Sequence, residues 1–157
     1  LYVISENDSG HLIESNISVK TNLKTWLQKN KMINDGIDII DAHIINIGFS
    51  YEAVVDPNLN SLSVLADVDS RLKTLFAEKM YIAEPLYINQ IYNTINKTRG
   101  VVDTVKVTLE IKQGADYSSM PIDISDITSP DGTYIKTPKN CILELKYLDR
   151  DIKGASV

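Results

Sequence analysis

GVVDTVKVTLEIK, residues 100–112, is the stretch of sequence that decides the fold. Every second residue from Val101 to Ile111 is apolar except Asp103, and the residues between them are mostly polar. Alternation with a period of two, filled largely by β-branched residues, is typical of a strand with one buried and one exposed face. We therefore predict a strand here that starts at Gly100, where glycine permits a tight turn.

Asp103 is the one carboxylate in the apolar register of this strand. A buried carboxylate needs a partner, whereas one at the rim of a sheet can reach water. Because Asp103 lies near the start of the strand, we predict that it sits at the rim and pairs with Lys97 or Arg99. Deep burial without either cation nearby would instead indicate a hidden site.

Periodicity and capping residues predict the remaining helices and strands. They are a short strand at 1–5, a helix from 17 to about 31, an extended segment at 37–55, helices at 61–76 and 85–99, and a final strand at 141–147. Ser15 or Asn16 is a suitable N-cap for the first helix. That helix contains several poor helix formers, so we expect packing to stabilise it more than propensity does.

Three segments lack strong periodicity. Residues 32–36 are predicted to form a connector, and 148–157 a polar tail that frays. Residues 113–140 are rich in Asp, Ser, Pro, Gly and Thr, which indicates a long excursion before the last strand. Within it we predict a weak strand at 120–124 and a turn at 130–132 with Tyr134-Ile135 as the returning arm.

The predicted order is β-α-β-α-α-β-β, which favours an α+β fold. We expect a mixed, mostly antiparallel sheet with helices packed on one face, ferredoxin-like in outline. A right-handed crossover through two helices would make the strands at 43–55 and 101–112 parallel. We predict one domain over 1–157. Because the sequence opens on an apolar run without methionine, we expect it to be a fragment of a longer chain.

Composition narrows the classes of function. The net charge of the 157 residues is −5, and the basic residues are dispersed, which argues against a nucleic-acid partner. The single cysteine, Cys141, excludes an intrachain disulfide and a metal site built on cysteine pairs. No apolar run approaches the roughly 20 residues of a membrane-spanning helix, so we expect no membrane partner.

Candidate catalytic residues lack the neighbours that catalysis needs. Neither His11 nor His43 has a second histidine at ligand spacing, so we interpret both as structural or exposed. Cys141 begins an apolar strand and is interpreted as a small buried hydrophobe rather than a nucleophile. An enzyme fragment with Asp103 and Cys141 in one cleft, beside a histidine, is kept as an alternative.

Two sets of carboxylates could suggest cation binding. Asp35, Asp38 and Asp41 recur at every third position, but they lack the glycine and distal glutamate of an EF-hand loop. We interpret them, and likewise Asp123 and Asp126, as solvated. Phosphate-binding glycine loops and serine-centred motifs are also absent from the sequence. We therefore predict no catalytic, cofactor-binding or metal-binding residues and no cofactor.

A long part of the sequence resembles a known family. This part combines a strand, a polar turn, two helices joined at 80–84, and a "GV" start to an alternating strand. Its sequence is IINIGFSYEAVVDPNLNSLSVLADVDSRLKTLFAEKMYIAEPLYINQIYNTINKTRGVVDTVKVTLEI. This pattern resembles the C-terminal region of Baseplate J-like proteins, the baseplate wedge proteins of contractile-tailed phages. The last segment, residues 130–154, is similar to the end of the wedge protein of large myophages; its sequence is PDGTYIKTPKNCILELKYLDRDIKG. Glu84 departs from the pattern, since many relatives carry glycine there.

The resemblance implies a structural role rather than an enzymatic one. Such proteins hold wedges together around the tail hub and rearrange when the sheath contracts. It implies a virion location in the tail baseplate after assembly in the host cytoplasm, and partners that are copies of the chain, as a homodimer within a ring, and other wedge proteins. The alternative from the fold outline alone is a small-ligand-binding or regulatory α+β module.

Overall fold

The computed structural model describes residues 1–32 and 36–157, and in this part the chain is an α+β protein with five helices and mixed sheets. The helices are α1 (Ile17–Gln28), α2 (Ser61–Leu75), α3 (Ile88–Asn96), α4 (Ile124–Ile127) and α5 (Leu148–Asp151). The strands are β1 (Tyr2–Val3), β2 (Ser5–Glu6), β3 (Leu12–Ile13), β4 (Ile40–Asp41), β5 (His43–Val55), β6 (Leu86–Tyr87), β7 (Val101–Ile111), β8 (Tyr134–Ile135), β9 (Cys141–Glu144) and β10 (Ile152–Ser156). Most of the predicted connector at 32–36 lies outside the described residues.

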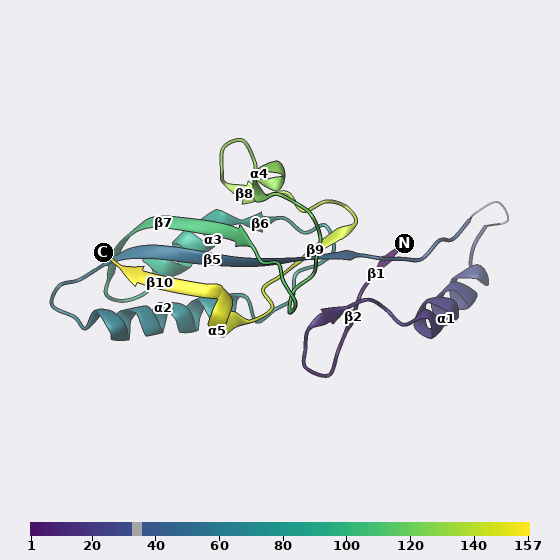
Figure 1. Cartoon of the computed structure of the whole chain (residues 1–157), viewed down its shortest axis with the longest axis horizontal. Coiled ribbons are helices and arrows are strands. Elements are labelled where there is room, and N and C mark those ends of the chain that lie inside the picture. Colours follow the sequence, from purple (N-terminus) through teal and green to yellow (C-terminus); the bar gives the residue numbers. More distant parts are fainter. Residues whose placement is uncertain (33–35) are drawn as a thin grey trace.

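Strand β5 is the centre of the main sheet (Figure 1). It pairs antiparallel with β7, while β9 runs parallel to its first part and β10 parallel to its second part. The prediction that residues 43–55 and 101–112 are parallel is therefore wrong, and β5 has more parallel than antiparallel neighbours. The chain runs back along the sheet in α2 and returns in α3, so β7 begins at the end of the sheet where β5 stops and runs antiparallel to it. There the Asp56 N–H donates to the Gly100 carbonyl at 2.9 Å.

Strand β7 contains two irregularities that the alternation of its sequence hides. Relative to β5, it carries one extra residue at Val105 and another at Val102. Each β-bulge moves the following side chains to the other face of the sheet. Thr104 therefore points inward and is buried, whereas Val105 and Asp103 are exposed.

The predicted rim position of Asp103 is confirmed, but its predicted pairing is wrong. Its carboxylate accepts a hydrogen bond from the N–H of Thr104 at 2.8 Å. Among the described residues, neither Lys97 nor Arg99 comes within 4 Å of it as an ion pair. Because Asp103 is exposed, it does not indicate a hidden site at this strand.

Gly100 closes the connection between α3 and β7. Its φ of +93° lies in the left-handed region, which favours glycine. A Cβ atom at this position would lie 2.7 Å from Leu59 and 2.8 Å from Val64, so the start of β7 also needs the absence of a side chain. The sequence-based interpretation of Gly100 is confirmed.

Helices α2 and α3 cover one face of the main sheet. The inward side chains of β5, Phe49 and Tyr51 among them, pack against Val68 and Leu72 of α2. Ile91 and Ile95 complete this core from α3, where they lie one helical turn apart. On the opposite face, Ser50 and Glu52 of β5 are exposed to solvent.

Segment 113–140 contributes to a second core at the other end of β5. Ile127 of α4 and Ile135 of β8 are buried there with Cys141 and Leu143 of β9. The predicted turn and its returning arm are confirmed, since Gly132 N–H donates to the Ser129 carbonyl at 2.8 Å and the returning arm is β8. The predicted strand at 120–124 is not formed, because α4 begins at residue 124.

The predicted frayed tail is also wrong. Residues 148–156 form α5 and β10, and β10 adds to the free edge of β5. Ile152 inserts into the first core. Gly154 leaves room for the Tyr51 ring, whose hydroxyl donates to Asp69 of α2 at 2.7 Å. Burial together with this bond raises the pKa of Tyr51 far above its usual range.

Candidate interaction surface

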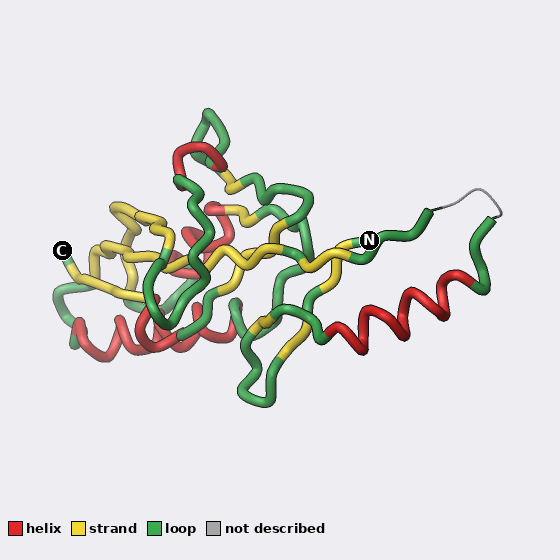
Figure 2. The backbone as a smooth tube through the Cα atoms, turned by 45° about the vertical axis from the view of Figure 1, so that its right-hand side comes forward, coloured by secondary structure: helices red, strands yellow, loops and turns green. Residues whose placement is uncertain are grey.

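The N-terminal arm, residues 1–32 and 36–42, extends away from the main sheet and carries α1 at its outer end (Figures 1 and 2). The predicted N-cap of α1 is confirmed at Asn16, whose side chain accepts the N–H of Ser18. The predicted packing is wrong, because α1 has no buried residue. Ile17 is 76% exposed and Trp26 is 62% exposed.

Exposed apolar side chains are concentrated along this arm. Those on the arm are Leu1, Tyr2, Ile13, Ile17, Val19, Trp26, Met32 and Ile40. Single exposed hydrophobic residues are normal on protein surfaces, but a set gathered on one projecting segment indicates an interaction site. A helix of this length is also marginal in water without packing. The arm therefore has the properties of a surface that another molecule covers.

Polar contacts fix the fold of the arm itself. Lys20 of α1 donates to the carboxylate of Asp41 at 2.5 Å, and the Ser15 N–H donates to the same side chain at 2.9 Å. The amino group of Leu1 donates to the carbonyl of Asp38 at 2.8 Å. The bond from Lys20 lowers the pKa of Asp41, against the opposing effect of burial.

We expect the arm to loosen in acid through Asp41. Because its folded pKa lies below 3.8, Asp41 contributes its full stabilisation above that pH and loses it as the pH falls through the folded value. Amide hydrogen exchange at Ser15 should therefore accelerate below pH 3.8, relative to its intrinsic rate. Asp41→Asn keeps an acceptor for the Ser15 N–H but removes the charge that binds Lys20, so this exchange should be faster at neutral pH than in the unmodified chain and should lose its acid dependence. The exposed Asp8 provides the control, and an unchanged acid profile in Asp41→Asn would contradict this role.

A buried polar junction joins the arm to the body. Glu144 of β9 accepts the Leu12 N–H at 2.8 Å with one carboxylate oxygen and the Asn46 side-chain amide at 2.8 Å with the other. Asn46 in turn accepts the N–H of Ser118 at 2.7 Å. Asn46 is 1% exposed and Glu144 is 9% exposed. One pair of side chains thus holds the β2–β3 hairpin and the start of the excursion against β5.

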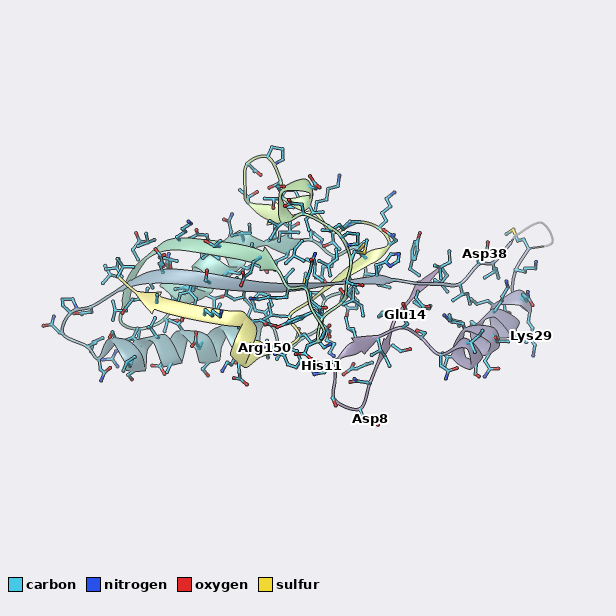
Figure 3. The ribbon with its side chains drawn as sticks, viewed as in Figure 1. Asp8, His11, Glu14, Lys29, Asp38 and Arg150 are labelled. Carbon is cyan, nitrogen blue, oxygen red and sulfur yellow. The ribbon has the colours of Figure 1, made fainter. Side chains whose placement is uncertain are left out.

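A second buried carboxylate anchors the excursion to α5. Asp151 accepts the Tyr117 hydroxyl at 2.5 Å and the Tyr147 N–H at 3.1 Å. The Arg150 guanidinium lies 4.9 Å from the ring centre of Tyr117 and 4.3 Å from that of Tyr147, and the ring of His11 meets Tyr147 edge to face. Burial and the bond to Asp151 raise the pKa of Tyr117. Figure 3 shows Arg150 and His11 on neighbouring segments.

A cavity of about 240 Å³ adjoins this junction. It lies between the hairpin loop near His11, the segment that follows α2 up to Met80, and Glu144. Both oxygens of Glu144 are already bonded, and Lys79 pairs with Glu6 at 3.1 Å. Glu144 and Lys79 therefore serve the contact between arm and body, whereas Glu78, which also lines the cavity, is exposed.

The structure separates the residues of the enzyme alternative. Cys141 lies directly opposite His43 on β9 and β5, but the thiol is fully buried, and burial raises its pKa. A nucleophilic cysteine needs the opposite shift. Asp103 pairs with Val54 near the far end of β5, so no cleft brings it to Cys141.

The remaining acidic candidates serve local structure. Asp41 binds Lys20, and Asp38 lies 3.8 Å from Lys24, whereas Asp35 lies outside the described residues. Asp123 caps α4 by accepting the N–H of Ser125, which lowers the pKa of Asp123. Asp126 is exposed in the first turn of α4. Within residues 1–32 and 36–157, no group of three or more His, Cys, Asp or Glu side chains could hold a metal ion.

Comparison with protein-family models and with curated protein sequences identifies no relative. No protein-family model matches the chain, and no curated protein sequence matches it significantly. None of the helices in the described part of the chain has the length and apolar character needed to cross a membrane.

Proposed function

We propose that this chain is a structural component of a contractile-tailed phage baseplate wedge. It makes protein–protein contacts that hold wedges together around the tail hub and that rearrange when the sheath contracts. The proposal combines the sequence resemblance to Baseplate J-like wedge proteins with the physical character of the arm. Its location is then the virion, after assembly in the host cytoplasm, and it acts without a cofactor.

The observation that carries the proposal is α1, a helix with no buried residue at the end of a projecting arm. Such a helix gains stability when a partner covers its apolar side chains. The partners we propose are further copies of the chain, as a homodimer within a ring, and other baseplate wedge proteins. Neither nucleic acid nor a membrane is among them. A ferredoxin-like outline for the body stays a prediction.

Reconstitution tests this proposal. The purified chain is examined by sedimentation velocity alone and after mixing with the other wedge proteins of the same phage. We expect self-association at high concentration and a stable complex with at least one wedge protein. α1 should gain protection from amide exchange in those assemblies. A chain that stays monomeric and binds no wedge protein would contradict the proposed role.

The cavity beside Glu144 favours one alternative, a module that binds a small ligand. Its volume of about 240 Å³ is below the usual range for drug-sized ligands, which starts near 300 Å³. Two of its charged groups, Glu144 and Lys79, are already bonded within the chain. A screen of small metabolites by thermal shift would favour this alternative only if stabilisation disappeared in a variant that fills the cavity at Ala77.

A further inference from the structure

A groove of about 750 Å³ lies between the end of α2 and the start of α3. Its walls include Leu75 of α2, its C-cap residue Phe76, Tyr81 and Glu84 of the junction, and Tyr87 at the start of α3. Tyr81 is 78% exposed and Tyr87 is 48% exposed. Exposed tyrosines are enriched at protein interfaces, because they offer apolar area with a polar tip.

The rim of this groove carries uncompensated negative charge. Glu78 is exposed, and in the described part of the chain it has no hydrogen bond or ion pair. Glu84 accepts the N–H of Tyr81 at 2.6 Å, and its side chain also lines the groove. The one lysine of the rim, Lys79, is already paired with Glu6. A fitting partner is therefore apolar with basic flanks.

Helix α1 has this character. Val19, Leu23 and Trp26 follow one another at spacings of four and three, so they share a face. Between residues 15 and 32 the sequence contains four lysines and no acidic residue, and of these lysines Lys20 and Lys24 pair with Asp41 and Asp38 of the same arm. Lys29 is exposed and has no ion-pair partner in the described residues, and Figure 3 places it at the outer end of the arm.

No residue of α1 lines this groove within the same chain. Figures 1 and 2 show α1 at the outer end of the arm, and the end of α2 and the start of α3 within the body. We propose that α1 of one copy docks in the groove of a second copy, with Trp26 between Tyr81 and Tyr87 and with Lys29 facing Glu78. Two copies that exchange arms in this way form a closed two-fold dimer. This inference rests on the proposed structural role and names the surface through which copies meet.

Photo-crosslinking tests the docking directly. Benzoylphenylalanine replaces Trp26 in one preparation, which is mixed with an equal amount of ¹⁵N-labelled unmodified chain and irradiated. We expect crosslinks from the modified copy to labelled peptides that cover residues 75–90. Crosslinks to another surface of the labelled copy would overturn the docking and leave the structural role intact. A mixture that forms neither crosslinks nor any assembly with wedge proteins would overturn both.

Charge reversal tests the polar contact. Lys29→Glu and Glu78→Lys are each expected to weaken dimerisation about fivefold, and their combination should restore most of the affinity. Trp26→Ala should weaken it more than tenfold, as expected for a buried aromatic anchor. Gln28→Ala, on the opposite side of α1, is the matched control. Dimer affinity that is unchanged by Trp26→Ala, or not restored in the charge-swapped pair, would overturn the proposal.

Discussion

Alanine at Asp151 is expected to lower the free energy of unfolding by about 3 kcal/mol. The side chain is 1% exposed, and its carboxylate is the acceptor for both the Tyr117 hydroxyl and the Tyr147 N–H. Removing it leaves two donors without their acceptor and a small void beneath α5. Chemical denaturation followed by far-UV circular dichroism measures the loss, because the single tryptophan, Trp26, lies exposed on the arm and does not report on the body.

A control two residues away isolates the effect of burial. Asp149 lies in the same helix and pairs with Lys73 at 2.5 Å, but its side chain is 91% exposed. An exposed ion pair contributes at most about 1 kcal/mol, so Asp149→Ala should change stability little. Asp151→Asn should fall between the two alanine variants, because its amide keeps one acceptor oxygen. Equal losses in Asp149→Ala and Asp151→Ala would contradict a special role for the buried carboxylate.

The importance of Asp151 also shows where sequence reasoning fails. Residues 148–157 have no alternation and many polar side chains, so the pattern predicts a tail. The segment is nevertheless ordered by contacts with residues distant in sequence, namely Tyr117 and the free edge of β5. Periodicity within a short window carries no information about such contacts. The burial of Glu144 could not be predicted for the same reason, because alternation alone places it on the polar face of its strand.

The main strands and helices could be predicted because each covers a core with its own periodic pattern. Ile91 and Ile95 of α3, and Phe49 and Tyr51 of β5, occupy the buried positions that their spacing indicates. The direction of β7, and the faces of Asp103 and Thr104 between its two bulges, could not be predicted in this way. The direction depends on how two helices return the chain, and the faces depend on bulges that alternation cannot reveal.

Helix α1 is a different kind of case. Its apolar spacing predicts a packed helix, and the helix forms with its N-cap at Asn16 but without a packing partner. The apolar spacing of α1 therefore predicts a buried helix face, but the body of this chain does not cover that face. The junction after α2 carries local backbone strain, since Ala83 adopts a φ of +65°, which side chains other than glycine rarely adopt.

Glu144→Ala is the second substitution with a large expected effect, and it should act on the arm. We expect a loss of about 3 to 4 kcal/mol, because the Leu12 N–H and the Asn46 amide lose a charged acceptor in a buried position. Amide exchange at Leu12 should accelerate more than exchange in α3, whose packing on β7 does not involve Glu144. Glu144→Gln keeps the side-chain volume and one acceptor, so its effect should be smaller.

The exposed Glu14 provides the matched control, since Glu14→Ala removes the same side chain from the neighbouring hairpin without a buried partner. Its stability and its exchange at Leu12 should stay close to those of the unmodified chain. Uniform acceleration across Leu12 and α3 in Glu144→Ala would mean that the junction stabilises the body alone. Selective loosening would instead show that one carboxylate sets the position of the arm, and with it the position of α1 relative to any partner.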